Sequence, residues 1–379
     1  MKPVRQITEP PTNPGRSEWQ IIDWTIDAES LECRPSFPAG YRPGVGIVGC
    51  GGIVTLAHLP AYTAYGVDVV GVYDPAPEAT RGLRERFPVV GRVFESLDEL
   101  LAEPRIEIVD IATHPAERFE LVEQALEAGK HVLSQKPFAL ELGAARELVE
   151  DAERRGLRLA VNQNGRWAPP WRIATLLVQQ GAVGEVCAVT HLYEHDFGWT
   201  LDSWPDELEH FVVYDFSSHW IDITRCWLDA KTIAAVRALE YRNPGQPPES
   251  KAPWGAWVLA ECTDGTSAAI RSIGTETQRP GNPFWIHGTE GTIRGSVRQG
   301  TDFVELERDG TVTRYALEGD WFPDGFAGTL GELCSAIAED REPFNSARHN
   351  LLSLQMTLAA CRSAERNGAP VALSEDAGG

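Results

Sequence analysis

The chain has 379 residues, enough for two domains, and its 42% hydrophobic and 23% charged residues are typical of a globular protein. The formal net charge of −21 argues against nucleic acid or a membrane surface as a partner, because both are polyanions. The N-terminus lacks the apolar core of a signal peptide and no apolar run is long enough to cross a bilayer, so we expect a cytoplasmic protein.

An arm precedes the first regular pattern. Residues 1–43 show no sustained periodicity and end in a proline-rich stretch. A disordered leader is one interpretation. An arm docked on its own domain or on a neighbouring subunit is supported at least as well, because several residues are too apolar for a fully solvated tail. These residues are Trp19, Ile21, Ile22, Trp24 and Ile26.

A strand, a glycine turn and a helix open the folded part. Gly49 permits the tight turn out of the strand at 45–49, and Gly51 lets the backbone approach a pyrophosphate. The following helix directs free N–H groups at the phosphates. Val54 is larger than the usual third small residue, and a plain structural turn is the alternative. The predicted contacts of this turn with a dinucleotide are Gly49, Gly51, Gly52 and Ile53.

An acidic residue ends the next strand. Asp74 follows the apolar run at 69–73 and lies 23 residues after Gly51. At this place a carboxylate accepts hydrogen bonds from the adenosine ribose and repels a 2′-phosphate. We therefore expect NAD as the cofactor, with NADP less favoured.

The pattern then alternates between short β-rich runs and stretches with helical period. The predicted strands are 45–49, 69–73, 107–112, 131–134 and 158–162; the predicted helices are 52–65, 77–87, 96–102, 116–128 and 141–155. Alternation with such short connections is typical of a parallel, doubly wound sheet. We assign residues 44–165 to an α/β dinucleotide-binding domain of the Rossmann type.

The pattern changes after residue 165. A helix at 168–180 is followed by long β-rich runs, and two helices close the chain. The runs are 185–197, 233–241, 255–262, 267–275, 284–287, 291–296, 303–308 and 312–317, and the closing helices are 324–339 and 346–366. Residues 166–379 thus predict a second, α+β domain with a large, mostly antiparallel sheet, whose uncovered face is expected to mediate oligomerisation.

Five motifs together resemble the family of glucose–fructose oxidoreductase, inositol dehydrogenase and MocA. They are the turn at 46–53, His58-Leu59-Pro60-Ala61, Val109-Asp110-Ile111-Ala112-Thr113, the stretch from Glu127 through Gln135-Lys136-Pro137, and Asp215-Phe216-Ser217-Ser218-His219. The resemblance covers roughly residues 44–373. It implies an NAD(P)-binding first domain, an open-sheet second domain that binds sugar or polyol substrates, and a homodimer or homotetramer.

The resemblance places Lys136 at the family's Glu-Lys-Pro lysine, where it reaches both nicotinamide and substrate. An ammonium there stabilises alkoxide character as hydride leaves the carbon. The alternative is a solvated surface lysine. Gln135 replaces the usual glutamate, which removes the charge that would partner the lysine. We expect Gln135 to contact the cofactor.

Asp215 and His219 match the family's Asp-x-x-x-His pair. Residues i and i+4 share one helix face, so both side chains could meet one substrate oxygen or each other. We expect His219 to act as general base and Asp215 to orient it or to hold a neighbouring hydroxyl. A simple surface pair is the alternative. With Lys136, these residues form the predicted catalytic set.

Weaker candidates surround these motifs. Thr113, His114 and Asn164 are expected to contact the cofactor; Arg166, Tyr193, His195 and Trp199 are expected to contact substrate. Arg118 stands where many family members have a histidine, so that contact cannot be transferred. No tight ligand motif predicts a metal site.

The leading interpretation is an NAD-dependent dehydrogenase that oxidises a secondary hydroxyl of a neutral sugar, glycoside or cyclic polyol. A glycosidase that uses tightly bound NAD transiently is a second hypothesis on the same fold. A non-catalytic NAD-binding regulatory protein is the third; the joint presence of Lys136, Asp215 and His219 argues against it.

Overall fold

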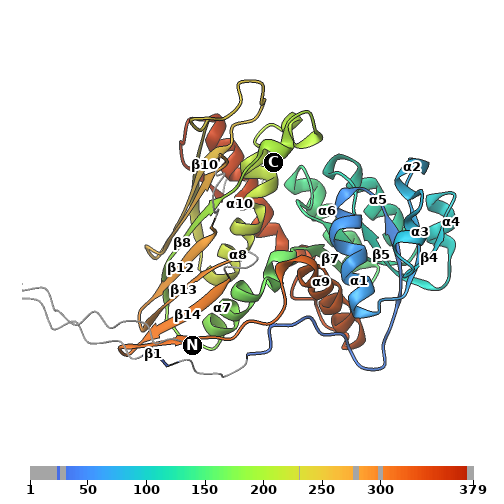
Figure 1. Cartoon of the computed structure of the whole chain (residues 1–379), viewed down its shortest axis with the longest axis horizontal. Coiled ribbons are helices and arrows are strands. Elements are labelled where there is room, and N and C mark those ends of the chain that lie inside the picture. Colours follow the sequence, from blue (N-terminus) through green and yellow to red (C-terminus); the bar gives the residue numbers. More distant parts are fainter. Residues whose placement is uncertain (1–23, 26–30, 230, 276–280, 298–301, 374–379) are drawn as a thin grey trace, which may run out of the picture.

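The computed structural model describes residues 24–25, 31–229, 231–275, 281–297 and 302–373. It contains two β-sheets (Figure 1), the larger on the left of the view and the smaller within the domain on the right.

The smaller sheet belongs to the first domain and has the predicted parallel arrangement. Its strands are β2 (Gly44–Val48), β3 (Val69–Tyr73), β4 (Val90–Val93), β5 (Ile106–Ile111), β6 (His131–Gln135) and β7 (Leu159–Asn162), in the order β4-β3-β2-β5-β6-β7. Every residue of the central strand β2 is buried, because helices cover both faces of the sheet. The predicted Rossmann fold is confirmed.

Helices of the first domain follow the prediction with local differences. They are α1 (Leu59–Tyr65), α2 (Pro77–Thr80), α3 (Leu83–Arg86), α4 (Leu97–Ala102), α5 (Pro115–Glu127) and α6 (Leu142–Arg154). The helix predicted at 52–65 contains a π-helical segment, η1 (Val54–His58), and that at 77–87 is divided into α2 and α3. The unpredicted edge strand β4 has one buried residue in four, so it carries little apolar pattern.

The larger sheet belongs to the second domain and is mostly antiparallel, as predicted. Its strands are β8 (Val186–Glu194), β9 (Ile233–Tyr241), β10 (Gly255–Cys262), β11 (Ser267–Ile273), β12 (Pro283–Gly288), β13 (Gly291–Ser296), β14 (Phe303–Arg308) and β15 (Thr311–Arg314), with the two-residue strands β1 (Trp24–Thr25) and β16 (Val371–Ala372) at its edges. The order among the described residues is β1-β15-β14-β13-β12-β8-β11-β10-β9-β16. Only β8 with β11 and β1 with β15 pair in parallel there.

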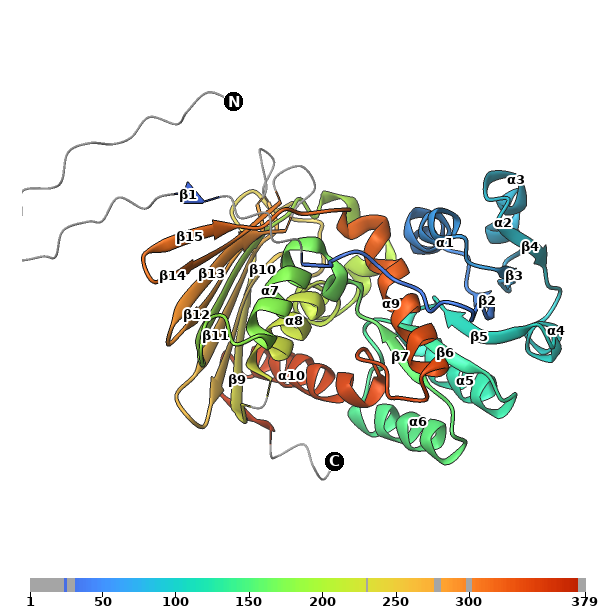
Figure 2. The same cartoon turned by 90° about the horizontal axis from the view of Figure 1, so that it is seen from below.

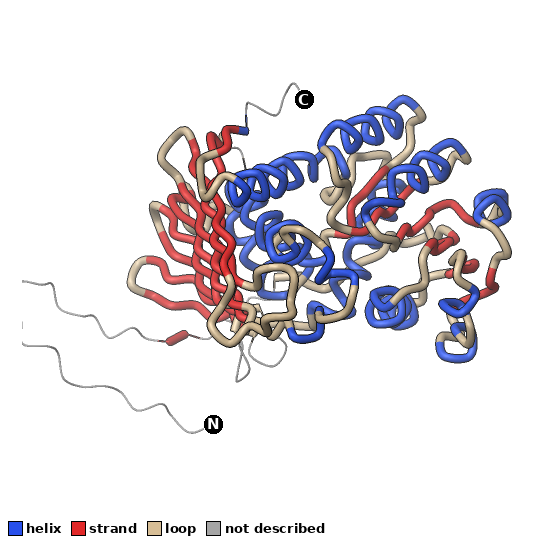
Figure 3. The backbone as a smooth tube through the Cα atoms, turned by 90° about the horizontal axis from the view of Figure 1, so that it is seen from above, coloured by secondary structure: helices blue, strands red, loops and turns tan. Residues whose placement is uncertain are grey.

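Helices cover one face of the larger sheet. Figures 2 and 3 show α7 (Pro169–Gln179), α8 (Ser218–Leu228) and α10 (Ala347–Glu365) between this sheet and the first domain, while the opposite face is turned away. Strand β10 accordingly alternates buried and exposed residues, as a sheet covered on one side requires. None of the helices in the described ranges is long and apolar enough to span a membrane.

Helix α9 (Trp321–Ala338) belongs by sequence to the predicted second domain but packs against the first. Its residues Phe326, Leu330 and Leu333 are buried in the same apolar cluster as Val45 and Ile47 of β2. A division at residue 165 therefore assigns each sheet to its own domain, but the apolar core of the first domain also contains residues from α9.

The described part of the arm packs against its own chain. Cys33 is buried, and the Phe37 ring lies 6.0 Å from the Tyr65 ring between centroids. A Cβ on Gly331 would lie 2.3 Å from the carbonyl oxygen of Ser36, so the arm backbone touches α9 closely. Trp24 pairs with Val312 of β15, whereas the apolar residues at 19–22 and 26 lie outside the described residues.

Candidate active site

The glycine turn after β2 fits a dinucleotide. Gly49 has φ +89°, and a Cβ there would lie 2.8 Å from the carbonyl oxygen of Ala112. A Cβ on Gly51 or on Gly52 would meet no atom within 4 Å, so the backbone borders open space where the following helix begins. The first turn of a helix has N–H groups without helical partners, and these bind anions such as a pyrophosphate.

Asp74 is fixed beside this turn. Its Oδ2 accepts a hydrogen bond from the backbone N–H of Cys50 at 2.8 Å, and its Oδ1 accepts one from Ala76 at 2.8 Å. A carboxylate oxygen has two lone pairs, so each oxygen keeps one for a further donor. Asp74 thus both braces the turn and remains able to accept ribose hydroxyls.

Lys136 connects the two domains at the end of β6. Its Nζ donates to the backbone oxygen of Asp215 at 3.0 Å and to Asp215 Oδ1 at 3.2 Å. Both side chains are 14% exposed. An ammonium carries three N–H donors, so one donor remains for another acceptor. We call Lys136, Asp215 and His219 the interdomain cluster.

Asp215 and His219 do not share one regular α-helix, which corrects the prediction. Asp215 lies in the π-helical segment η5 (Val212–Phe216), and His219 lies in the first turn of α8. The extra residue per turn changes the relation between the two positions. Lys136 contacts Asp215 directly and also influences His219 electrostatically.

His219 is held as a neutral base. Burial lowers its pKa well below the usual value, the charge of Lys136 lowers it further, and Asp222 opposes the shift. The Nδ1 atom is buried and has no hydrogen-bond partner among the described residues. The ring meets the Trp321 ring edge to face, with centroids 5.2 Å apart. His219 as a whole is partly exposed, so its other ring nitrogen, Nε2, is the atom of this neutral imidazole that is able to accept a proton from a bound molecule.

The backbone around Lys136 is supported by two residues. Gln135 Oε1 accepts a hydrogen bond from the Lys136 N–H at 2.8 Å. Buried Arg118 donates to the carbonyl oxygens of Gln135 at 2.6 Å, of Thr113 at 2.5 Å and of Pro137. No role was predicted for Arg118, because its acceptors are backbone carbonyls, which carry no signal in a sequence.

A second polar group lies wholly inside the first domain. His58 Nδ1 lies 2.6 Å from Asp110 Oδ2, and the Tyr62 hydroxyl donates to the same oxygen at 2.6 Å. His58 Nε2 lies 3.3 Å from Gln135 Nε2. We call Tyr62, Asp110, His58 and Gln135 the buried cluster. Sequence analysis quoted the motifs of His58 and Asp110 but assigned them no role.

Three predicted contacts are engaged elsewhere. Arg166 is buried and forms two hydrogen bonds of 2.7 Å with Asp222, so it serves as a structural ion pair rather than a substrate contact. Tyr193 is fully buried, and its hydroxyl lies 2.6 Å from Ser217 Oγ. Buried Asn164 accepts a hydrogen bond from Trp321 Nε1 at 2.7 Å, which positions Trp321 instead of a cofactor.

The remaining candidates lie at accessible positions. His195 is partly exposed, and its ring lies 5.0 Å from that of Phe216, next to Asp215. Trp199 is exposed in the segment after β8. The ring of His114, after β5, meets the ring of Trp204 at 4.5 Å between centroids. The segment after β8 therefore touches the cofactor-domain loop that contains Thr113 and His114.

Two family models match the chain. Residues 44–163 match an oxidoreductase family with an NAD-binding Rossmann fold, and residues 171–294 match the GFO/IDH/MocA C-terminal domain. The chain belongs to the GFO/IDH/MocA family. This membership confirms the resemblance seen in the motifs and assigns residues 44–163 to the NAD-binding Rossmann domain of an oxidoreductase family.

Two relatives with curated names match different shares of this chain. A D-apiose dehydrogenase of Paraburkholderia graminis is 29% identical over 344 residues, which cover 86% of this chain and 88% of that relative. An uncharacterised oxidoreductase of Schizosaccharomyces pombe is 39% identical over 133 residues. That match spans only 34% of this chain and 36% of the relative.

Solved structures share the fold over most of this chain. An oxidoreductase from Agrobacterium radiobacter, in complex with NAD+, L-tartaric acid and magnesium, has a TM-score of 0.76 at 24% identity and covers 88% of this chain and 99% of its own. A scyllo-inositol dehydrogenase from Lactobacillus casei, with bound NAD(H) and scyllo-inositol, has a TM-score of 0.73 at 21% identity with the same coverage. At these identities the likeness shows the fold alone.

Proposed function

We propose that the protein is an NAD-dependent dehydrogenase that transfers hydride between nicotinamide and a secondary hydroxyl of a neutral sugar, glycoside or cyclic polyol. The main support is the interdomain cluster. Asp215 holds the Lys136 ammonium, which keeps one unused donor, and His219 contributes a neutral imidazole with no hydrogen-bond partner for Nδ1 among the described residues. The D-apiose and scyllo-inositol dehydrogenases among its relatives support this substrate class.

The side chains divide the work on the substrate hydroxyl. His219 accepts the hydroxyl proton, because burial and Lys136 keep its imidazole neutral. The third donor of Lys136 hydrogen-bonds the same oxygen and stabilises its developing negative charge. Asp215 fixes the direction of that donor by occupying the other two. NAD+ supplies the hydride acceptor when it is bound.

The first domain supplies the groups that hold the cofactor. The backbone at Gly51 and Gly52 receives the pyrophosphate, and Asp74 receives the adenosine ribose. Asp74 would repel a 2′-phosphate, which favours NAD over NADP. Thr113 and His114 lie in the loop beside Gly49, and Gln135 precedes Lys136, so these side chains border the path of the nicotinamide half.

A neutral substrate suits the charges around the interdomain cluster. Arg166 is neutralised by Asp222, and Arg118 is occupied by three carbonyl groups. Lys136 is itself paired with Asp215. A phosphate on the substrate would therefore gain little, and the net charge of −21 opposes it.

The deciding experiment measures reduced-nicotinamide absorbance with NAD or NADP and a panel of sugars, glycosides, inositols and sugar phosphates. We expect reduction of NAD by a neutral polyhydroxy compound. Aglycone release without net NADH would instead establish the glycosidase. NAD binding with no turnover on any compound would favour the regulatory protein, and stronger activity with sugar phosphates would contradict the neutral substrate.

We further propose that the protein forms a homodimer or homotetramer through the outer face of the larger sheet. Leu239 of β9 is 49% exposed, and Trp257 and Leu259 of β10 are 38% and 39% exposed. Trp257 lies opposite Leu239 in the strand register, so the three side chains form one apolar area. Light scattering should show an oligomer, and Trp257→Glu should shift it toward the monomer; a wild-type monomer at micromolar concentration would contradict the proposal.

A further inference from the structure

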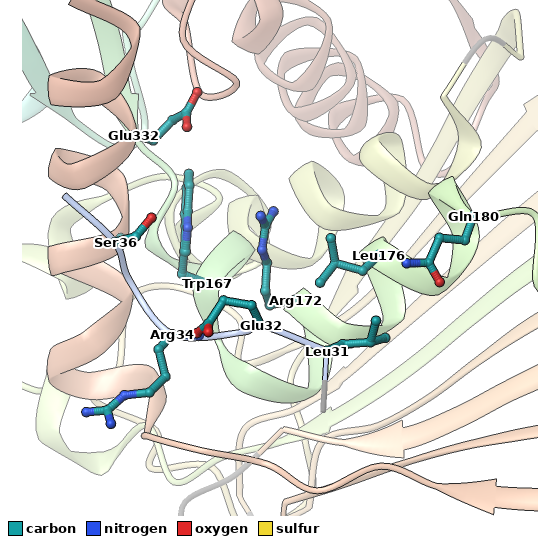
Figure 4. Close-up of a pocket in the computed structure, with 10 residues that line it drawn as sticks. Leu31, Glu32, Arg34, Ser36, Trp167, Arg172, Leu176, Gln180 and Glu332 are labelled. Carbon is teal, nitrogen blue, oxygen red and sulfur yellow. The ribbon is translucent and has the colours of Figure 1, made fainter. Parts of the chain in front are cut away.

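A cavity of about 360 Å³ lies apart from the interdomain cluster, between the arm, α7 and α9 (Figure 4). Its walls share no residue with the interdomain cluster. They comprise Leu31, Glu32, Arg34, Ser36, Trp167, Arg172, Leu176, Gln180, Gly328 and Glu332. The proposed dehydrogenase activity assigns this cavity no role.

Arg172 gives the cavity an uncompensated positive charge. It projects from α7, and its guanidinium has neither a hydrogen bond nor an ion pair with the described residues. Burial lowers the pKa of Arg172, and the charge of Glu332 only partly opposes this. Arg172 is partly buried, and a guanidinium offers five N–H donors, which no described side chain or carbonyl accepts here. An entering anion would accept these donors.

Two of the other three charged side chains of the wall are paired, and the third, Glu32, accepts a hydrogen bond from the backbone N–H of Arg34 at 3.2 Å. Glu332 binds Arg341, with Nη2 to Oε2 at 3.2 Å, and accepts the backbone N–H of Phe344 at 2.7 Å. Arg34 lies 3.8 Å from Glu318 and points away from Arg172 in Figure 4. Arg172 is therefore the lining cation that is free to bind a ligand.

Apolar groups stand beside this cation. The Trp167 ring centroid lies 5.8 Å from the Arg172 guanidinium carbon. Gly328 makes room for this ring, because a Cβ there would lie 2.2 Å from its Cγ. Leu31 and Leu176 continue the wall. A ligand would thus meet one cationic fork and a short apolar surface.

We propose that the cavity is a binding site for a small organic carboxylate. The carboxylate forms paired hydrogen bonds with Arg172, whose planar fork matches its geometry, and the carbon body lies along Trp167 and Leu176. A single guanidinium balances one negative charge, and the neighbouring Glu32 and Glu332 carboxylates disfavour a dianion such as phosphate. A volume of about 360 Å³ suits a small metabolite.

Isothermal titration calorimetry with the full chain tests this site. The probes are glucuronate, hexanoate and benzoate, each compared with its neutral counterpart glucose, hexanol or benzyl alcohol, with sulfate as a bare anion. At least one carboxylate should bind about 10- to 100-fold more tightly than its counterpart, the difference expected for hydrogen bonds to a charged group. Arg172→Gln should abolish that difference.

Matched variants separate this site from the interdomain cluster. Arg34→Gln removes a lining arginine that is already paired, and Lys136→Met alters the interdomain cluster; both should leave carboxylate binding unchanged. Arg172→Lys keeps the charge but loses the fork, so it should bind with intermediate affinity, and thermal melts verify that each variant is folded. No carboxylate binding, equal loss in Lys136→Met, undiminished binding in Arg172→Gln, or sulfate binding as tight as any carboxylate would each overturn the proposal.

Discussion

The buried cluster and the interdomain cluster contain similar groups but differ in whether another molecule can reach them. In the buried cluster, His58 and Tyr62 both meet Asp110 at 2.6 Å, and all three side chains are fully buried, so the unpartnered Asp110 Oδ1 is closed to a ligand. In the interdomain cluster, Lys136 keeps a donor, and the side chains of Lys136, Asp215 and His219 are all partly exposed. A histidine near a carboxylate is thus no sign of chemistry by itself.

The two clusters also differ in where their elements come from. Tyr62, His58 and Asp110 belong to one domain and support its core. Lys136 comes from the end of β6, whereas Asp215 and His219 come from η5 and α8 of the other domain. Spare hydrogen-bonding capacity at a boundary between domains therefore marks the functional site better than residue type does.

The largest expected effect comes from removing the proposed base. His219→Ala should lower turnover about 10²- to 10⁴-fold, the usual contribution of a positioned general base. It should also remove the acidic limb of the pH–rate profile. In the wild type that limb should lie below pH about 6.5, the usual pKa of histidine. Burial lowers the pKa of His219, so the imidazole is protonated only when the pH falls further. A near-normal rate with an unchanged profile would transfer proton abstraction to another residue.

Lys136→Met should be the next largest change. It removes the charge that stabilises the substrate oxygen and should lower kcat about 10²- to 10³-fold above the acidic limb, as loss of one such donor does. The acidic limb should itself move to higher pH, because Lys136 no longer lowers the pKa of His219. Fluorescence titration should show NAD affinity close to wild type, since Lys136 is not part of the glycine turn. A rate loss confined to one pH limb would show that Lys136 acts as a proton carrier instead.

The buried cluster should respond in stability rather than in rate. Asp110→Asn removes the charged acceptor of His58 and Tyr62 and should lower the free energy of unfolding by about 1.5–3 kcal/mol. The folded fraction should retain turnover within about tenfold of wild type. Denaturant melts and kcat per folded enzyme measure the two effects. A stable but inactive Asp110→Asn variant would show that the buried cluster takes part in turnover, which would contradict its structural role.

The smallest effect should come from the aromatic neighbour of His219. Trp321→Ala admits water to the imidazole, so the lowered pKa of His219 should rise toward its usual value and the acidic limb should move to higher pH. Rates above that limb should change little. Trp321→Phe keeps the ring and serves as the control. An acidic limb that stays in place in Trp321→Ala would show that Trp321 does not shield His219.

Sequence patterns predicted those features that depend on local order. The periodicity of apolar residues and the positions of glycines in turns predicted both sheets. The family motifs predicted Lys136, Asp215 and His219 as site residues. The edge strand β4 was missed because three of its four residues are exposed. The π-helical segment at Asp215 was missed because a single π-helical turn of five residues next to an α-helix is too short to leave its own periodic pattern in the sequence.

Residues that act through distant partners could not be assigned in advance. The role of Arg118 depends on three carbonyl groups, and that of Arg166 depends on Asp222, 56 positions later. Trp321, at the start of α9, contacts both Asn164 of the first domain and His219 of the second. These relations arise from tertiary packing, which leaves no periodic pattern.

The most direct test of the interdomain cluster follows hydride itself. A substrate identified by the panel would be prepared with deuterium on the carbon that bears the reacting hydroxyl, and the reduced nicotinamide would be analysed by mass spectrometry. We predict one deuterium in each reduced nicotinamide formed by the wild type, with formation greatly slowed in Lys136→Met and His219→Ala. Reduced nicotinamide without deuterium, or product formed at a normal rate by both variants, would contradict the account.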